Sequence, residues 1–256
     1  MIYWWSYIVC IVSIAISPSA LYAINEPDCV TIYNTAGSLY RDGQFHGALA
    51  LYDSLIADGI KNSDLFYNAS NAAYRTGSLG KAILYLERSL NLAPSDHDAL
   101  SNLTFLNSKK QDQEPSHSNV IIEYLSGYYN TLTINSIALF SVISFALGML
   151  VLTLILFVQR WKRLLCITIV GLTGVVFLLS TGMLIEKIHY KATVIEAVVM
   201  DEEAHAYSGP GTENTHIFTL HEGTKIVVGR SQDSWNLIRL KSGAGGWIKA
   251  ETMERI

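Results

Sequence analysis

The sequence predicts a membrane protein in three parts: an all-α repeat module, a transmembrane helical hairpin and a small all-β module. Three observations predict this arrangement. Two long apolar segments without charges lie in the second half of the chain. Helical segments in the first half match one another at a constant offset, and short runs rich in Val, Ile and Trp, separated by turn formers, fill residues 192–256.

The apolar segments Ile134–Val158 and Leu164–Ile185 are separated by the short basic stretch Gln159–Arg163. At about 1.5 Å of rise per residue, each segment can cross a hydrocarbon layer of about 30 Å. Cations in the bilayer core cost roughly 2.5–3.5 kcal/mol each, so the connector must face water, and positive charge favours the cytoplasmic side. We therefore predict transmembrane helices at residues 132–158 and 164–186 and a cytoplasmic loop at 159–163. Two buried helices of a soluble bundle are the alternative.

The N-terminal residues 1–23 have the length and order of a secretory signal peptide. An apolar run is followed by small residues up to Ala23, where we expect cleavage. Because no Lys or Arg precedes the apolar run, an uncleaved anchor is the alternative. Either version exports the following module, and two further crossings return the C-terminal module to the same outer side.

Charge and cysteine content narrow the possible functions. The formal net charge is −4, and both predicted soluble parts carry more acidic than basic side chains. This balance argues against nucleic-acid binding, which requires a basic surface. Cys10 and Cys166 lie in apolar segments, which leaves Cys29 on the outer side and predicts no internal disulfide there.

Residues 24–107 match themselves when the sequence is shifted by 34 residues. Because 34 residues is the period of the tetratricopeptide repeat, this match predicts two such repeats. In the second copy, Gly77 ends the first helix, Ala82 permits close helix packing, and Pro94 stops the second helix. A further helix at about 96–107 would cover the open end. An unrelated helical bundle is the alternative. The offset aligns Asn34 with Asn68, Tyr40 with Tyr74, Arg41 with Arg75, Gly43 with Gly77 and Ala48 with Ala82.

Stacked repeats of this kind present a concave face formed by the first helix of each pair. Aromatic area and guanidinium groups on that face suit an extended peptide. The alternative is that some of these tyrosines complete the packing of the repeats themselves. The predicted peptide-binding residues are Tyr33, Tyr40, Arg41, Tyr67, Asn71, Tyr74, Arg75 and Asn102.

Residues 108–131 join the repeats to the membrane. The polar stretch Lys109–Ser118 predicts a flexible linker. The stretch Val120–Tyr129 is apolar and aromatic and predicts a helix at the surface of the lipid bilayer.

Residues 192–256 predict a small closed barrel of about five short strands. The order of Tyr207–Pro210, Phe218–Lys225 and Gly246–Ile248 resembles a bacterial SH3-like domain. In such barrels the final Gly-Trp-Ile strand is buried, so the resemblance places Trp247 in the core. The predicted surface residues are Tyr207, His221 and Trp235.

The whole arrangement resembles the BatE-type proteins of the Bacteroides aerotolerance (Bat) operons, and the resemblance covers nearly the whole chain. It is carried by Tyr67–Tyr74, Lys81–Arg88 and Phe218–Lys225. Ala69 and Ser70 depart from the Leu-Gly common in tetratricopeptide repeats. The resemblance implies an inner-membrane protein with both soluble domains in the periplasm. It further implies that the protein functions together with membrane proteins that carry von Willebrand-type domains and with a MoxR-type ATPase system.

We find no sequence pattern for catalysis, a cofactor or a metal ion. The histidines form no close-set ligand pair in the sequence, and the glycine-rich stretches lack the setting of a phosphate loop. We therefore expect a non-catalytic scaffold that mediates protein–protein interactions in the cell envelope. The alternative is a protein that binds peptidoglycan, or a peptide of the cell wall, through its SH3-like domain.

Overall fold

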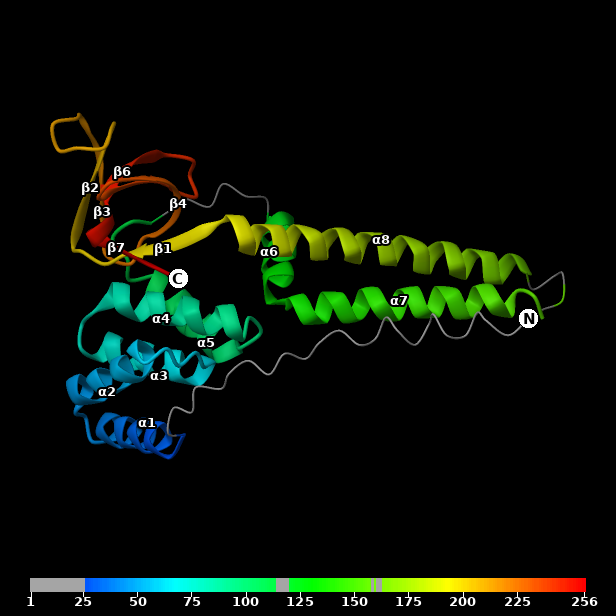
Figure 1. Ribbon diagram of the computed structural model, residues 1–256, viewed down its shortest axis with the longest axis horizontal. Coiled ribbons are helices and arrows are strands. Elements are labelled where there is room, and N and C mark those ends of the chain that lie inside the picture. Colours follow the sequence, from blue (N-terminus) through cyan, green and yellow to red (C-terminus); the bar gives the residue numbers. More distant parts are fainter. Residues whose placement is uncertain (1–25, 114–119, 158, 160–162) are drawn as a thin grey trace, which may run out of the picture.

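The computed structural model describes residues 26–113, 120–157, 159 and 163–256. Within these residues the chain forms eight α-helices and one seven-stranded antiparallel sheet. Figure 1 shows a long antiparallel pair of helices that projects from two compact modules. The predicted signal peptide, residues 1–23, lies outside the described residues.

The N-terminal module, here the repeat module, contains five helices. Polar side chains begin α3 and α5: the Asn62 side chain accepts from the Leu65 N–H at 3.0 Å, and Asp96 caps α5. Gly43 and Gly77 have φ of 77° and 87°, conformations in which glycine ends a helix without strain. The helices are α1 (Glu26–Arg41), α2 (Phe45–Ala57), α3 (Ser63–Arg75), α4 (Leu79–Leu92) and α5 (His97–Asn107).

Small side chains let these helices approach closely. Ala36, Ala48, Ala69 and Ala82 are each 0 % exposed. Larger apolar groups fill the remaining space, and α5 closes the end of the stack through the buried Leu106. Tyr52 and Leu86 are buried in this core, whereas Phe45, Ile56, Leu90, Leu100 and Leu103 are only partly buried.

The projecting pair consists of α7 (Ile134–Leu154) and α8 (Arg163–Thr193). Both are long and apolar enough to cross a membrane. Small polar residues lie between them: the hydroxyls of Ser141 and Thr181 are 2.7 Å apart, and Gly148 lies against Thr173. Helix α8 continues beyond the predicted segment 164–186 and ends just before the first strand, so it joins the hairpin directly to the sheet.

Helix α6 (Val120–Thr131) runs across the end of the hairpin (Figure 1). Lys187 of α8 donates to the backbone oxygens of Tyr129, at 3.1 Å, and Leu132, and so holds this crossing in place. Much of its apolar surface is open, since Ile121 and Tyr124 are 67 % and 76 % exposed. This arrangement suits the helix predicted at the bilayer surface.

The C-terminal module, here the sheet module, has strand order β3-β2-β6-β5-β4-β1-β7 with antiparallel pairing throughout. Its inner face includes Val199, Ile226, Ile238 and Ile248, each at most 1 % exposed. The sheet curls around this core (Figure 1). The strands are β1 (Ile195–Val199), β2 (Glu203–Tyr207), β3 (His216–His221), β4 (Lys225–Gln232), β5 (Trp235–Arg239), β6 (Gly245–Lys249) and β7 (Met253–Arg255).

The prediction that Trp247 lies in the core is wrong. In β6 the buried residues are Gly246 and Ile248, and Trp247 between them is half-buried. Its register partners are Tyr207 and Leu237, neither of which is buried. Successive residues of a strand face opposite sides, so burial of Ile248 turns Trp247 to the outer face.

The two modules pack directly against each other. Val198 of β1 belongs to the same apolar cluster as α4, and Met200 and Ile256 pack against that cluster. Arg88 of α4 reaches Glu254 at 2.9 Å. The repeat module precedes the apolar hairpin and the sheet module follows it. Their contact places both modules at one end of the hairpin, as the predicted pair of membrane crossings requires.

The first part of the predicted flexible linker is attached rather than free. Asp112 accepts hydrogen bonds from the His221 N–H and the Thr224 hydroxyl, both at 2.7 Å, and contacts the His221 ring. The composition of the linker is polar, as predicted, but one carboxylate in the right place attaches it to the sheet module. Residues 114–119 lie outside the described residues.

Candidate functional site

The face formed by α1, α3 and α5, which the sequence predicts to be concave, carries a recurring tyrosine–asparagine contact. Asn68 donates to the Tyr33 hydroxyl at 2.6 Å, and Asn102 donates to the Tyr67 hydroxyl at 3.1 Å. The second contact lies one 34-residue period after the first, and Asn102 also donates to Asn71 at 3.2 Å. These bonds tie α1 to α3 and α3 to α5. Four predicted peptide-binding residues therefore also hold the stack together.

The other four predicted peptide-binding residues contact different neighbours. Tyr74 packs edge-on against Phe105 at 5.6 Å, and the Arg75 guanidinium lies 3.9 Å from the centre of the Phe45 ring. Arg75 is thus engaged in a cation–π contact. Tyr40 also packs against Phe45, but Arg41 donates to Ser38 at the concave face of α1. The structure therefore does not gather all eight residues into one site.

A hollow of about 380 Å³ opens on the concave face of the first repeat. Tyr52 of α2 reaches it from beneath, although the residue is only 2 % exposed. Burial, together with neighbouring Tyr33, raises the pKa of Tyr52 to about 12, so its hydroxyl keeps its proton. The hollow is lined by Tyr33, Asn34, Gly37, Ser38, Tyr40, Arg41, Tyr52 and Asn68.

A second candidate surface lies on the outer face of the sheet module. The rings of Tyr207 and Trp235 are 5.5 Å apart and perpendicular, and His216 packs 5.9 Å from Tyr207. Trp247 lies beside Tyr207 in the register of β2 and β6. Tyr207 and Trp235 are two of the three predicted surface residues of this module, and the structure brings them together.

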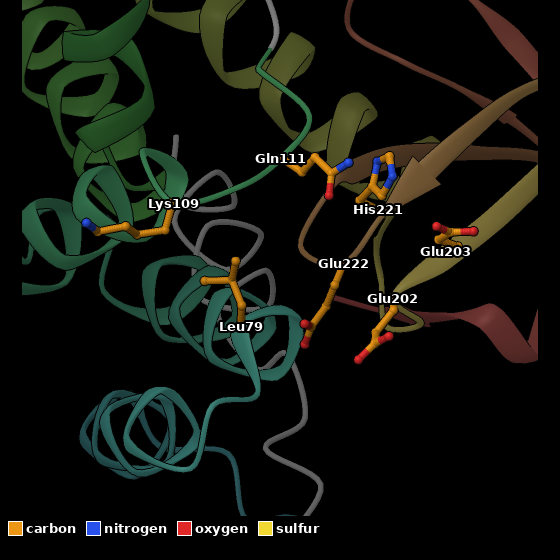
Figure 2. A pocket seen from close by; sticks show the side chains of 7 residues that line it. All are labelled: Leu79, Lys109, Gln111, Glu202, Glu203, His221 and Glu222. Carbon is orange, nitrogen blue, oxygen red and sulfur yellow. The ribbon is translucent and has the colours of Figure 1, made fainter.

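His221, the third predicted surface residue, lies elsewhere. It contacts Asp112 of the linker and lines a hollow of about 320 Å³ between the two modules. Figure 2 shows Glu222 directed toward the start of α4, whereas Glu203 points away from the other labelled side chains. The Glu222 carboxylate accepts from the Gly80 N–H at 2.7 Å. This hollow, which is also lined by Leu79, Lys109, Gln111 and Glu202, is part of the contact between the modules.

The described ranges contain no group of three or more His, Cys, Asp or Glu residues that could hold a metal ion. His205 and His216 do meet, with ring centres 5.3 Å apart, and both lie 3.1 Å from the Thr219 hydroxyl. This pair is not apparent in the sequence, because the two histidines lie on the different strands β2 and β3 and their spacing does not reveal the register.

Gly37 and Tyr52 were also missed as site residues. Aligning the repeats at their 34-residue offset would have indicated both, because Gly37 matches Asn71 and Tyr52 matches Leu86. At these positions the first repeat departs from the second, and the hollow lies there.

Comparison with models of protein families finds no match for this sequence. No curated protein matches it either. Function is therefore inferred from the geometry of the chain itself.

Proposed function

We propose that this protein is a non-catalytic membrane scaffold that binds other envelope proteins through the concave face of its repeat module. The observation that carries this proposal is the open concave hollow, held on a module that is docked to a second module at one end of an apolar hairpin. Two modules that pack on each other at the end of a membrane hairpin can hold a bound partner at a constant distance from the bilayer. Such a role requires no reactive group.

The finer assignments belong to the same proposal. We assign the helix pairs as tetratricopeptide repeats, because the contacts recur at 34 residues, and the curled sheet as an SH3-like domain, because its short strands form one antiparallel sheet around a single core. We further propose that the protein acts in a Bat-type complex for aerotolerance or stress. Its partners there would be membrane proteins with von Willebrand-type domains and a MoxR-type ATPase system.

The orientation is part of the proposal too. The basic connector between the two apolar helices favours a cytoplasmic turn, which leaves both modules in the periplasm of a bacterial inner membrane. A reporter fused after Ile256 should be active outside the cytoplasm. Activity of that reporter in the cytoplasm would refute the envelope role.

Site-specific photo-crosslinking in native membranes tests the scaffold role. A crosslinking residue in place of Asn34, which is exposed on the concave side, should capture a discrete membrane partner. The matched control is Ala50, exposed on the neighbouring helix α2 but outside the hollow. Equal capture at the two positions would remove the concave face from the mechanism.

A second candidate function is binding of peptidoglycan by the sheet module. The adjacent, partly exposed side chains of Tyr207, Trp235 and Trp247 favour it, since an accessible aromatic ring can stack on the face of a sugar ring. The full chain in detergent should then sediment with purified peptidoglycan, and Trp235→Ala should reduce the bound fraction several-fold. If the full chain stays in the supernatant, the sheet module serves protein contacts alone.

A further inference from the structure

The hollow in the first repeat arises from three differences between the repeats. At the 34-residue offset, Gly37 stands where the second repeat has Asn71, Ser38 stands opposite Ala72, and Tyr52 stands opposite Leu86. In the second repeat the Asn71 side chain accepts a hydrogen bond from Asn102, and Leu86 is fully buried. The first repeat therefore lacks one side chain on its concave face and has a hydroxyl beneath the gap.

Two donors converge on the space above Gly37. A Cβ atom at this position would lie 3.6 Å from Nη1 of Arg41 and 3.7 Å from the Tyr52 hydroxyl oxygen. Both groups are thus positioned around one small volume. Glycine keeps that volume open at a helix position where most other side chains would be tolerated by the backbone.

The Tyr52 hydroxyl is available for a ligand. Tyr52 is 2 % exposed, and among the residues that the structure describes no group forms a hydrogen bond with its hydroxyl. Among the described residues no buried side-chain oxygen lacks a partner, so the unpartnered Tyr52 hydroxyl oxygen opens into the hollow, where it can donate to a bound acceptor. The Tyr33 hydroxyl already accepts from Asn68 and still has its own proton to donate.

Charge restricts the chemistry of that acceptor. Arg41 is the one charged side chain among the residues that line the hollow in the described part of the chain. Its guanidinium uses one donor on Ser38, at 2.9 Å, and has further N–H groups free to form a fork. A cation with converging hydroxyl donors is matched by an anionic oxygen pair, and guanidinium forks fit carboxylates in particular.

We propose that the hollow over Gly37 binds a carboxylate of an extended peptide, with Arg41 and Tyr52 as its donors. The inference rests on the scaffold function proposed above and adds the ligand class. The carboxylate can belong to a peptide C-terminus or to an Asp or Glu side chain. Arg75, at the matching position of the second repeat, is stacked on Phe45 and takes no part.

Binding of the full chain in lipid nanodiscs to immobilised pentapeptide arrays tests this inference. Four matched arrays combine a free or amidated C-terminus with the presence or absence of internal Asp and Glu. Arrays with a carboxylate should retain the protein, and the amidated array without acids should not. Retention by free termini alone identifies the terminal group, and retention by internal acids alone identifies the side chain; either result supports the proposal.

Variants then locate the site. Arg41→Gln should weaken binding about tenfold or more, because a charged hydrogen bond is lost, whereas the matched Arg75→Gln should change it less than twofold. Gly37→Asn, which introduces the residue of the second repeat, should abolish binding while the helix still folds. Thermal unfolding of each variant checks the fold.

Equal retention on all four arrays, or equal effects of the two arginine substitutions, would overturn the inference. Neither result would refute the scaffold itself. Capture of a partner through position 34 that survives Arg41→Gln would leave the scaffold function standing without carboxylate recognition. If position 34 captures no partner in the protein that carries no other substitution, the scaffold function itself is contradicted.

Discussion

The two repeats use the same position to hold different neighbours. Asp53 of the first repeat contacts Lys81 and the Tyr85 hydroxyl of the second, each at 2.6 Å. Glu87 lies one 34-residue period later and contacts Lys225 of the sheet module at 3.0 Å. The sheet module thus occupies the place where α4 would otherwise meet a third repeat.

The packing of the sheet module on the second repeat explains how so short a repeat array can be stable. An array needs capping units to cover its terminal apolar face. Here α5 covers part of that face, and the sheet module covers α4, whose Ile83, Leu84 and Leu86 are each at most 1 % exposed. Among the residues that the structure describes, no element covers the concave side of the first repeat, and there the hollow lies. The second repeat packs against the sheet module, whereas the first repeat presents an open hollow.

The largest expected effect comes from filling the close contact at Gly80. A Cβ atom there would lie 2.8 Å from the backbone oxygen of Val199 and 2.7 Å from Cγ of Glu222. Gly80→His, which introduces the residue of the first repeat at this position, should destabilise the docked state by about 3 kcal/mol. Hydrogen exchange of β1 and α4 should rise sharply. The control is His46→Gly, which should cost no more than about 1 kcal/mol as an exposed helix substitution.

Unchanged exchange in Gly80→His would mean that the sheet does not rest on α4 in solution. That result would contradict the claim that the second repeat differs from the first by packing against the sheet module.

A middle effect is expected at Asp112. Asp112→Ala leaves the Thr224 hydroxyl, on a residue that is 2 % exposed, and the His221 N–H without their acceptor, at a cost of about 2 kcal/mol. Asp112→Asn keeps one acceptor oxygen and should recover part of that loss. Thermal unfolding and protease cleavage at the linker measure both variants. Equal stability of Asp112→Ala and the native chain would show that the linker is not attached.

The contribution of Asp112 should also depend on pH. Burial alone would raise its pKa, but the hydrogen bonds from Thr224 and His221 outweigh burial and lower it. A carboxyl whose pKa is lower in the folded state stabilises that state above its unfolded pKa of about 3.9, and this contribution is lost as the pH falls through the folded value. The stability difference between the native chain and Asp112→Ala should therefore shrink below about pH 4. A constant difference would contradict this assignment.

The smallest effects are expected at the two lysines of the comparison. Desolvation lowers the pKa of Lys225, but Glu87 and Glu196 raise it more, so the amine stays charged in the docked state. Because its side chain is 35 % exposed, Lys225→Met should cost about 1 kcal/mol. Lys81→Met removes one ion pair, with Asp53, whose two side chains are each about a third exposed, and should cost about 0.5 kcal/mol. Denaturant titration in detergent measures both, and the reverse order would contradict the greater role given to the sheet contact.

Local patterns predicted much of the architecture. The helices of the repeat module follow from their period, from Gly77 and from the Asp96 cap, because these signals act within a few residues. The apolar hairpin follows from segment length and the absence of charge. The resemblance to an SH3-like domain named Tyr207 and Trp235 as surface residues, and their rings do meet, but it assigned Trp247 to the core. Register and the outward turn of β6 decide that residue, and a short run does not reveal them.

Sequence alone determined the three parts of this protein, their order and the repeat period, since each is recorded in residues that lie close together in the chain. The tertiary structure decided which surfaces meet. The bond from Gly80 to Glu222 joins residues 142 positions apart, and the one from Asp112 to Thr224 joins residues 112 apart. Such contacts depend on the shape of two folded modules at once. The same holds for the hollow over Gly37, whose donors come from different helices and converge only when α1 packs on α2.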